Sequence, residues 1–309
     1  ILLIVDSFKM KNLRLIFILL FIFFACEDNS VDDTLDNSYS FFIAGHVYGK
    51  PGDDVVRNGL HPPFKNKFSL INQNSNIEFG IFLGDIVYRS NEESWNDVDR
   101  DLLEIDKPIY FAAGNHEFEG NSELFESRYG NTYYHFIHRG DLHIVLDPNL
   151  DNWNISNEQL EYLKETLNNN DVDNIFVSFH QMLWWSNDNI YQNVRLNSKE
   201  GRAELINFWS EIEPLFSSLE NNVIMMAGDL GAGGWADSIM FHNYDNITFV
   251  ASGMGGCGTN NCLGNDDGIG DDNFVIINVD INKDVSYELI AINRNNTHEL
   301  GELTDYLLP

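Results

Sequence analysis

Residues 108–117 read PIYFAAGNHE, an apolar run that stops at a glycine and then presents three polar side chains. Several other short apolar runs end in a polar residue in the same way: SFFIAGH (40–46), FGIFLGD (79–85), HIVLD (143–147), NIFVSFH (174–180) and NVIMMAGD (222–229). Runs of this length predict buried strands that carry polar groups at their carboxyl ends.

Helical patterns lie between several of these runs. Ser156 precedes NEQLEYLKETL, whose leucines share one helix face, so we expect a helix with Ser156 as its N-cap. Residues 201–219 predict another helix, and residues 274–281 and 285–294 predict a hairpin. Alternation of strands and helices predicts a layered α/β domain that binds ligands beyond its strand ends.

The composition supports one large domain and excludes one class of partner. The 309 residues are 43% hydrophobic and include 22 Phe and 6 Trp, enough for a sizeable core. Only 18 Lys and Arg stand against 48 Asp and Glu, a net charge of -30. Phosphate backbones need basic side chains, so we expect no nucleic-acid-binding surface.

The first 39 residues are expected to lie outside this domain. Ile1 is not an initiator residue, so we expect translation to start at Met10 and residues 1–9 to be upstream read-through. Basic residues then precede an apolar run at 15–25, which is shorter than the ~20 residues of a spanning helix and typical of a signal peptide. Residues 1–25 are therefore predicted to be upstream read-through followed by a signal peptide.

Ala25-Cys26 resembles the cleavage site of bacterial lipoproteins. The resemblance implies that Cys26 carries lipid and that the protein is exported and anchored in the outer membrane or at the cell surface of a bacterium. The acidic, polar residues 26–39 predict a tether, and residues 40–309 the folded domain. Membrane contact is expected through the lipid anchor only.

The remaining cysteines, Cys257 and Cys262, lie close together in a Gly- and Asp-rich segment, 253–273. In an exported protein this spacing predicts a small local disulfide, with free buried thiols as the alternative.

The predicted strand ends carry residues that bind metals. They present His46, Asp85, the run Asn115-His116-Glu117, His180 and Asp229. A single polar residue after a strand is typical of a turn. Five successive strand ends with ligand-type side chains indicate a metal centre.

The order and spacing of these residues resemble the calcineurin-like metallophosphoesterases. The resemblance rests on Gly84-Asp85, on Gly114-Asn115-His116-Glu117 and on His180. It implies a four-layer αββα sandwich and a metal-dependent phosphatase or phosphodiesterase. Its substrate would be a phosphoester small molecule or a phosphorylated macromolecule.

Two blocks depart from the family pattern. Ala44 stands where the family has Asp, and Asp229 and Gly231 stand where it has two His. By the family's assignments one ion keeps only His46 and the shared Asp85. The other ion keeps four ligands: Asp85, Asn115, His180 and Asp229. We therefore expect one tightly bound ion, and we expect Ala44→Asp with Gly231→His to restore a second.

The expected cofactor is a divalent metal from the group Mn²⁺, Mg²⁺, Ca²⁺, Fe²⁺ and Zn²⁺. The carboxylates of Asp85 and Asp229 balance one such ion. Asp229 in place of an imidazole makes the ligand set harder, which favours Mn²⁺, Mg²⁺ or Ca²⁺ over Zn²⁺. Asp53, Asp54 and Asp237 are further acids that could refill the vacated position.

The resemblance also assigns the catalytic groups. His116, next to the ligand Asn115, would stabilise the transition state or protonate the leaving group, with Glu117 orienting its ring. Trp184-Trp185 could line a substrate pocket or pack in the core. The alternative function is a degenerate family member at the cell surface that binds a phosphorylated or anionic ligand without turnover.

Overall fold

The computed structural model describes residues 37–49, 59–121, 123–232, 236–255 and 271–301. They belong to one compact unit that begins at Asn37. Within them, no helix is both long enough and apolar enough to cross a membrane. The predictions made for Cys26, Asp53, Asp54, Cys257 and Cys262 lie outside the described residues.

The first sheet has six strands and holds both ends of the folded unit. Its order is β12 (Thr297–Leu300), β11 (Val285–Ala291), β10 (Asn273–Val279), β1 (Tyr39–Ala44), β2 (Ile77–Leu83) and β3 (Ile109–Ala112). β1, β2 and β3 are parallel, so their carboxyl ends lie at one edge. The antiparallel pair β10 and β11 confirms the predicted hairpin.

The second sheet also has six strands. Its order is β4 (Tyr134–His138), β5 (Asp141–Val145), β6 (Asn174–Ser178), β7 (Asn222–Ala227), β9 (Ile247–Ser252) and β8 (Ile239–Tyr244). β5, β6, β7 and β9 are parallel to one another, with antiparallel strands at both edges. The six strands predicted from the apolar runs are all present, as β1, β2 and β3 in the first sheet and β5, β6 and β7 in the second.

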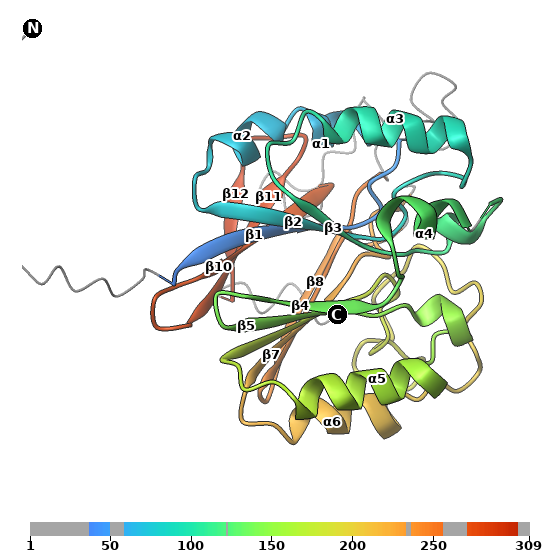
Figure 1. Ribbon diagram of the computed structural model, residues 1–309, viewed down its shortest axis with the longest axis vertical. Coiled ribbons are helices and arrows are strands. Elements are labelled where there is room, and N and C mark those ends of the chain that lie inside the picture. The colour runs from blue at the N-terminus through green and yellow to red at the C-terminus, as the bar shows by residue number, and fades with distance from the viewer. Residues whose placement is uncertain (1–36, 50–58, 122, 233–235, 256–270, 302–309) are drawn as a thin grey trace, which may run out of the picture. The chain divides into compact units, whose positions relative to one another are not determined.

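Helices cover the outer faces of both sheets (Figure 1). α1 (Pro62–Lys65), α2 (Phe68–Gln73) and α3 (Glu92–Leu102) cover the first sheet, and α5 (Asn157–Asn168) and α6 (Glu213–Ser217) the second. The chain also forms α4 (Glu123–Tyr129) and three short helical turns: η1 (His116–Phe118), η2 (Pro148–Asp151) and η3 (Phe208–Ile212). The fold is thus the predicted αββα sandwich.

Three buried clusters form the core. One lies between the sheets and is rich in aromatic rings, with Phe41, Phe79 and Phe176 in contact. The other two pack each sheet against its own helices. Trp184 and Trp185 belong to the second sheet's outer cluster and are almost completely buried, so they pack in the core.

One local prediction needs correction and another is confirmed. The predicted helix at 201–219 is reduced to η3 and α6, because Pro214 cannot donate a helical hydrogen bond and Asn207 bonds to the backbone of Ile155. The prediction that Ser156 is the N-cap of α5 is confirmed, although its hydroxyl donates to the Asp151 carboxylate (2.5 Å) and caps no helix N–H.

Candidate metal centre

Glycines at the strand ends let the two sheets approach each other closely. A Cβ built on Gly45, after β1, would lie 2.3 Å from the Cα of Gly228, after β7. A Cβ on Gly228 would lie 2.1 Å from the carbonyl oxygen of Leu83 in β2. Only glycine, which has no Cβ, permits contacts this short. The glycines therefore allow the strand ends of both sheets to meet at one place.

Three predicted ligands converge there. Asp85 follows β2, His180 follows β6 and Asp229 follows β7, and one ligand atom from each lies within 4.8 Å of the others. The Nε2 atom of His180 is 3.2 Å from Oδ1 of Asp85 and 3.7 Å from Oδ1 of Asp229. All three side chains are buried.

Backbone carbonyls orient the imidazoles. Nδ1 of His180 donates to the carbonyl of Leu83 (2.7 Å), and Nδ1 of His46 donates to that of Met254 (2.6 Å). With Nδ1 bonded to a carbonyl, each ring turns its Nε2 toward Asp85. A histidine that ligates through Nε2 needs this orientation, and an ion bound there displaces any proton on Nε2.

Asp85 presents its two oxygens to different neighbours. Oδ1 faces His180, whereas Oδ2 faces Nε2 of His46 (3.8 Å) and Nε2 of His116 (3.9 Å). His46 and Asp85 both have a positive φ, 52° and 54°. Non-glycine residues seldom adopt this conformation, although Asp and His do so more readily than most.

Burial and mutual charge set the ionisation of the centre. Burial raises the pKa of Asp229 to about 7 and lowers that of His46 to about 4. Burial disfavours the charged imidazole of His180, but the nearby Asp85 carboxylate outweighs this and raises its pKa to about 10. Burial likewise opposes ionisation of Asp85, yet the attraction of His180 keeps its pKa below the ordinary value.

The donor set fits a divalent cation. Both carboxylate oxygens of Asp229 are buried without a hydrogen-bond partner, and Nε2 of His180 lies beside them. Unpaired buried polar atoms are costly, and an ion among them would satisfy them and displace the proton held by His180 and Asp85. Two carboxylates and an imidazole are ligands that Mn²⁺ and similar ions accept.

Asn115 and His116 follow β3 beside this set. Asn115 is half-buried at the start of η1, and the backbone N–H of His116 donates to Oδ1 of Asp85 (3.3 Å). Nδ1 of His116 donates to the carbonyl of Tyr88 (2.7 Å). Burial alone would lower the pKa of His116, but the Asp85 carboxylate and the Tyr88 carbonyl raise it.

Glu117 has a different task from the one expected. Its fully buried carboxylate accepts hydrogen bonds from the backbone N–H groups of Asp85 (2.8 Å), Ile86 (2.8 Å), Val87 (3.2 Å) and Gly114 (2.6 Å). It therefore supports the turn that presents Asp85. The expectation that Glu117 orients the ring of its neighbour is corrected, because the Tyr88 carbonyl does so.

Ala44 and Gly231 carry no ligand-type side chain, and the backbone around Gly231 also leaves little room for one. Gly231 has φ +90°, and a Cβ there would lie 2.5 Å from the backbone of Gly253 and Met254. Ala44 packs in the apolar cluster under the helices of the first sheet. The expectation that Ala44→Asp with Gly231→His restores a second ion site stays a prediction, and a side chain at position 231 would require the backbone of Gly253 and Met254 to shift. Asp237, one suggested replacement ligand, is bound by Arg195 (2.5 Å).

Sequence reasoning missed one residue at this centre, Tyr48. Its hydroxyl lies 3.4 Å from Nε2 of His116, and its ring packs 4.4 Å from that of His46. Burial and the charge of Asp85 raise the pKa of the phenol, so it remains a hydrogen-bond donor. Its position two residues after His46 was the available signal.

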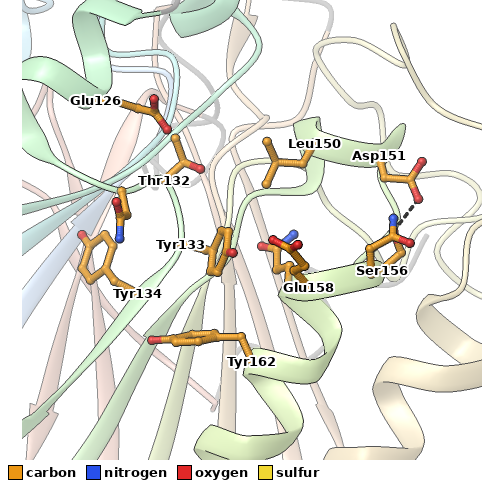
Figure 2. Close-up of a pocket in the computed structure, with 12 residues that line it drawn as sticks. Glu126, Thr132, Tyr133, Tyr134, Leu150, Asp151, Ser156, Glu158 and Tyr162 are labelled. Carbon is orange, nitrogen blue, oxygen red and sulfur yellow. Dashed lines mark hydrogen bonds between the residues drawn. The ribbon is translucent and has the colours of Figure 1, made fainter.

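A separate groove of about 700 Å³ lies between the start of β4, η2 and α5 (Figure 2). Tyr133, Tyr134 and Tyr162 line it with acidic side chains, among them Glu126 and Glu158. The Tyr134 hydroxyl is already bonded to the backbone of β3 (3.0 Å). No residue of the metal centre lines this groove.

The chain resembles one known family and several solved structures. The family model "calcineurin-like phosphoesterase" matches residues 46–213. The purple acid phosphatase PPD1 from yellow lupin (Lupinus luteus) seeds has a TM-score of 0.61 at 17% identity, over 85% of this chain and 53% of that one. A 5'-nucleotidase from Candida albicans has a TM-score of 0.44 at 13% identity, over 82% and 52% of the two chains.

The chain spans about half the length of these two solved structures. At this identity the lupin match shows a shared fold. Among curated proteins, none matches the sequence at a significant level.

Proposed function

This chain belongs to the calcineurin-like phosphoesterase family, and from that we propose that it hydrolyses phosphoric esters with one tightly held divalent ion. The supporting observation is the convergence of Asp85, His180 and Asp229, whose buried ligand atoms lie within 4.8 Å of one another. Asn115 and His46 stand beside them as the remaining candidate ligands.

A divalent ion at such a centre binds a phosphoryl oxygen and acidifies a water molecule. The chain's own residues supply the rest. The Tyr88 carbonyl fixes the ring of His116 through Nδ1, so that Nε2 faces the Oδ2 side of Asp85. From there His116 can give a proton to the leaving oxygen of an ester.

The closed second position supports the single-ion proposal. Position 231 has no room for a side chain, and position 44 contributes only a methyl group. The same observation supports the alternative, a protein that binds a phosphorylated ligand without turnover, because a missing ion lowers the stabilisation available to the transition state. Activity measurements separate the two.

The test combines metal analysis with hydrolysis of p-nitrophenyl mono- and diesters. We expect one ion per chain and hydrolysis that rises hyperbolically with added Mn²⁺. His116→Ala should lower turnover about 10²- to 10⁴-fold with the ion retained. His135→Ala, at an exposed position in β4, is the matched control and should change neither.

Two results would count against this proposal. Two ions per chain would exclude the single-ion centre. Loaded protein that cleaves no ester but binds phosphate would favour the ligand-binding alternative.

We also propose that the protein acts outside the cytoplasm, anchored through Cys26. The order of basic residues, apolar run, Ala25 and Cys26 supports this. In a bacterial host, Cys26→Ser should move the protein out of the membrane fraction, and unchanged fractionation would contradict the anchor.

A further inference from the structure

Tyr48 occupies a defined place in the metal centre. It follows β1, and its backbone N–H donates to the carbonyl of Asp85 (3.2 Å). Its ring lies between two imidazoles, 4.4 Å from that of His46 and 4.9 Å from that of His116. Only 3% of the residue is exposed, so the packing fixes the direction of the hydroxyl.

That direction is toward the vacated side of the centre. The ion-binding set meets Oδ1 of Asp85, whereas His46 and His116 both face Oδ2. The Tyr48 hydroxyl lies 3.4 Å from Nε2 of His116, which places it on the Oδ2 side. In the family pattern this side belongs to the ion whose ligands have become Ala44 and Gly231.

We propose that Tyr48 is a catalytic residue whose hydroxyl donates a hydrogen bond to a phosphoryl oxygen on the Oδ2 side, in place of a second ion. The inference rests on the proposed function, because it requires a phosphoryl group at the centre. The hydroxyl's present partner, Nε2 of His116, is at the long limit of a hydrogen bond. Such a weakly held hydroxyl is easily drawn to an anionic oxygen, which accepts hydrogen bonds strongly.

The distribution of positive charge supports this role. Two ions would place four positive charges around a phosphoryl group, and one ion leaves only two. A preorganised donor aimed at an oxygen that carries negative charge recovers part of the lost stabilisation. Among the described residues, the ion pairs and hydrogen bonds found at Asp85, Tyr48 and His116 involve no Lys or Arg, so the phenol and the His116 ring are the candidate donors on this side.

The test is Tyr48→Phe in the full chain, which keeps the ring against His46 and removes only the hydroxyl. Tyr133→Phe, in the groove of Figure 2, is the matched control. Calorimetry would measure the affinity of inorganic phosphate for the Mn²⁺-loaded proteins, with ion content and thermal midpoint recorded for each. We expect Tyr48→Phe to weaken phosphate binding about 10- to 100-fold at unchanged ion content, and Tyr133→Phe to match wild type. Turnover should fall in Tyr48→Phe as well.

The outcomes are distinguishable. Unchanged phosphate affinity in Tyr48→Phe, with wild type binding phosphate, overturns the role of Tyr48 and leaves the proposed function standing. A second bound Mn²⁺ in Tyr48→Phe would show that the phenol blocks an ion site, which also overturns the donor role. Loaded wild type that neither binds phosphate nor cleaves an ester overturns both proposals.

Discussion

The carboxylate of Glu117 accepts a hydrogen bond of 2.8 Å from the backbone N–H of Asp85, whose own carboxylate lies at the middle of the metal centre. Glu117 thus stabilises the backbone turn that presents Asp85, the ligand that both ions share in the family pattern. Asp85 sits at φ 54°, an unfavourable conformation that such support can maintain.

Glu117→Gln should therefore destabilise the protein and weaken the ion site together. An amide keeps the shape of the side chain, but its NH₂ group would face backbone N–H groups that need an acceptor. We expect the free energy of unfolding of ion-free protein to fall by about 1–3 kcal/mol, measured by urea denaturation. Mn²⁺ affinity should fall in the same variant. Glu123→Gln, at an exposed position in α4, should change neither; equal effects in the two variants would contradict this account.

Gly231→Ala separates backbone strain from steric conflict. Gly231 and Gly130 have nearly the same φ, +90° and +89°, but a Cβ on Gly130 meets nothing within 4 Å. Gly130→Ala should cost the strain alone, about 1–2 kcal/mol. Gly231→Ala adds contacts of 2.5 Å with backbone and should cost more and disturb His46, which bonds to the Met254 carbonyl. Equal losses in thermal unfolding would show that position 231 has room.

Asp229→Asn should lower Mn²⁺ affinity. The variant keeps the size of the side chain but removes one of the two charges that balance the ion, so we expect a loss of about 10-fold or more by calorimetry. Asp237→Asn removes a carboxylate that is held by Arg195 instead and serves as control. An unchanged affinity in Asp229→Asn would place the ion elsewhere.

Asp147 predicts a pH dependence of stability. Burial raises its pKa to about 6, whereas an unfolded aspartate titrates near ~3.9. Below ~3.9 it is protonated in both states and contributes nothing. As the pH rises to about 6 the unfolded chain loses its proton first, so the folded state loses stability; above about 6 the penalty is constant.

Asp147→Asn removes that penalty. Its free energy of unfolding should therefore gain on wild type between about pH 4 and 6, by at most about 3 kcal/mol, and then run parallel. Urea titrations with chelator present would measure the difference. Asp171→Asn, at an exposed position, is the control variant, and a gain of wild type over Asp147→Asn with rising pH would contradict the assignment.

The strand ends were predictable from sequence because each buried run stops at a glycine or a polar residue. That pattern placed Asp85, His180 and Asp229 at one edge of the sheets without any structure. The support that Glu117 gives to Asp85 was not predictable, because three of its four partners are backbone N–H groups 30 to 32 residues away, which no side-chain pattern records.

The lost ligand positions were also only partly predictable from the sequence. Sequence shows that Gly231 lacks a side chain, but only the structure shows that the backbone of Gly253 leaves no room for one. The failed helix at 201–207 has a similar cause, since Asn207 is bonded to the distant Ile155. Tertiary contacts decided both.

The candidate ligands come from both sheets, Asp85 from the first and His180 and Asp229 from the second. An ion bound there would link the two sheets. The concentration of free ion would then determine how often the sheets separate. Each tenfold rise in free ion above its dissociation constant adds about 1.4 kcal/mol to the free energy of opening. The rate of amide hydrogen exchange in β1, β2, β6 and β7 should then fall as the concentration of free metal around the protein rises.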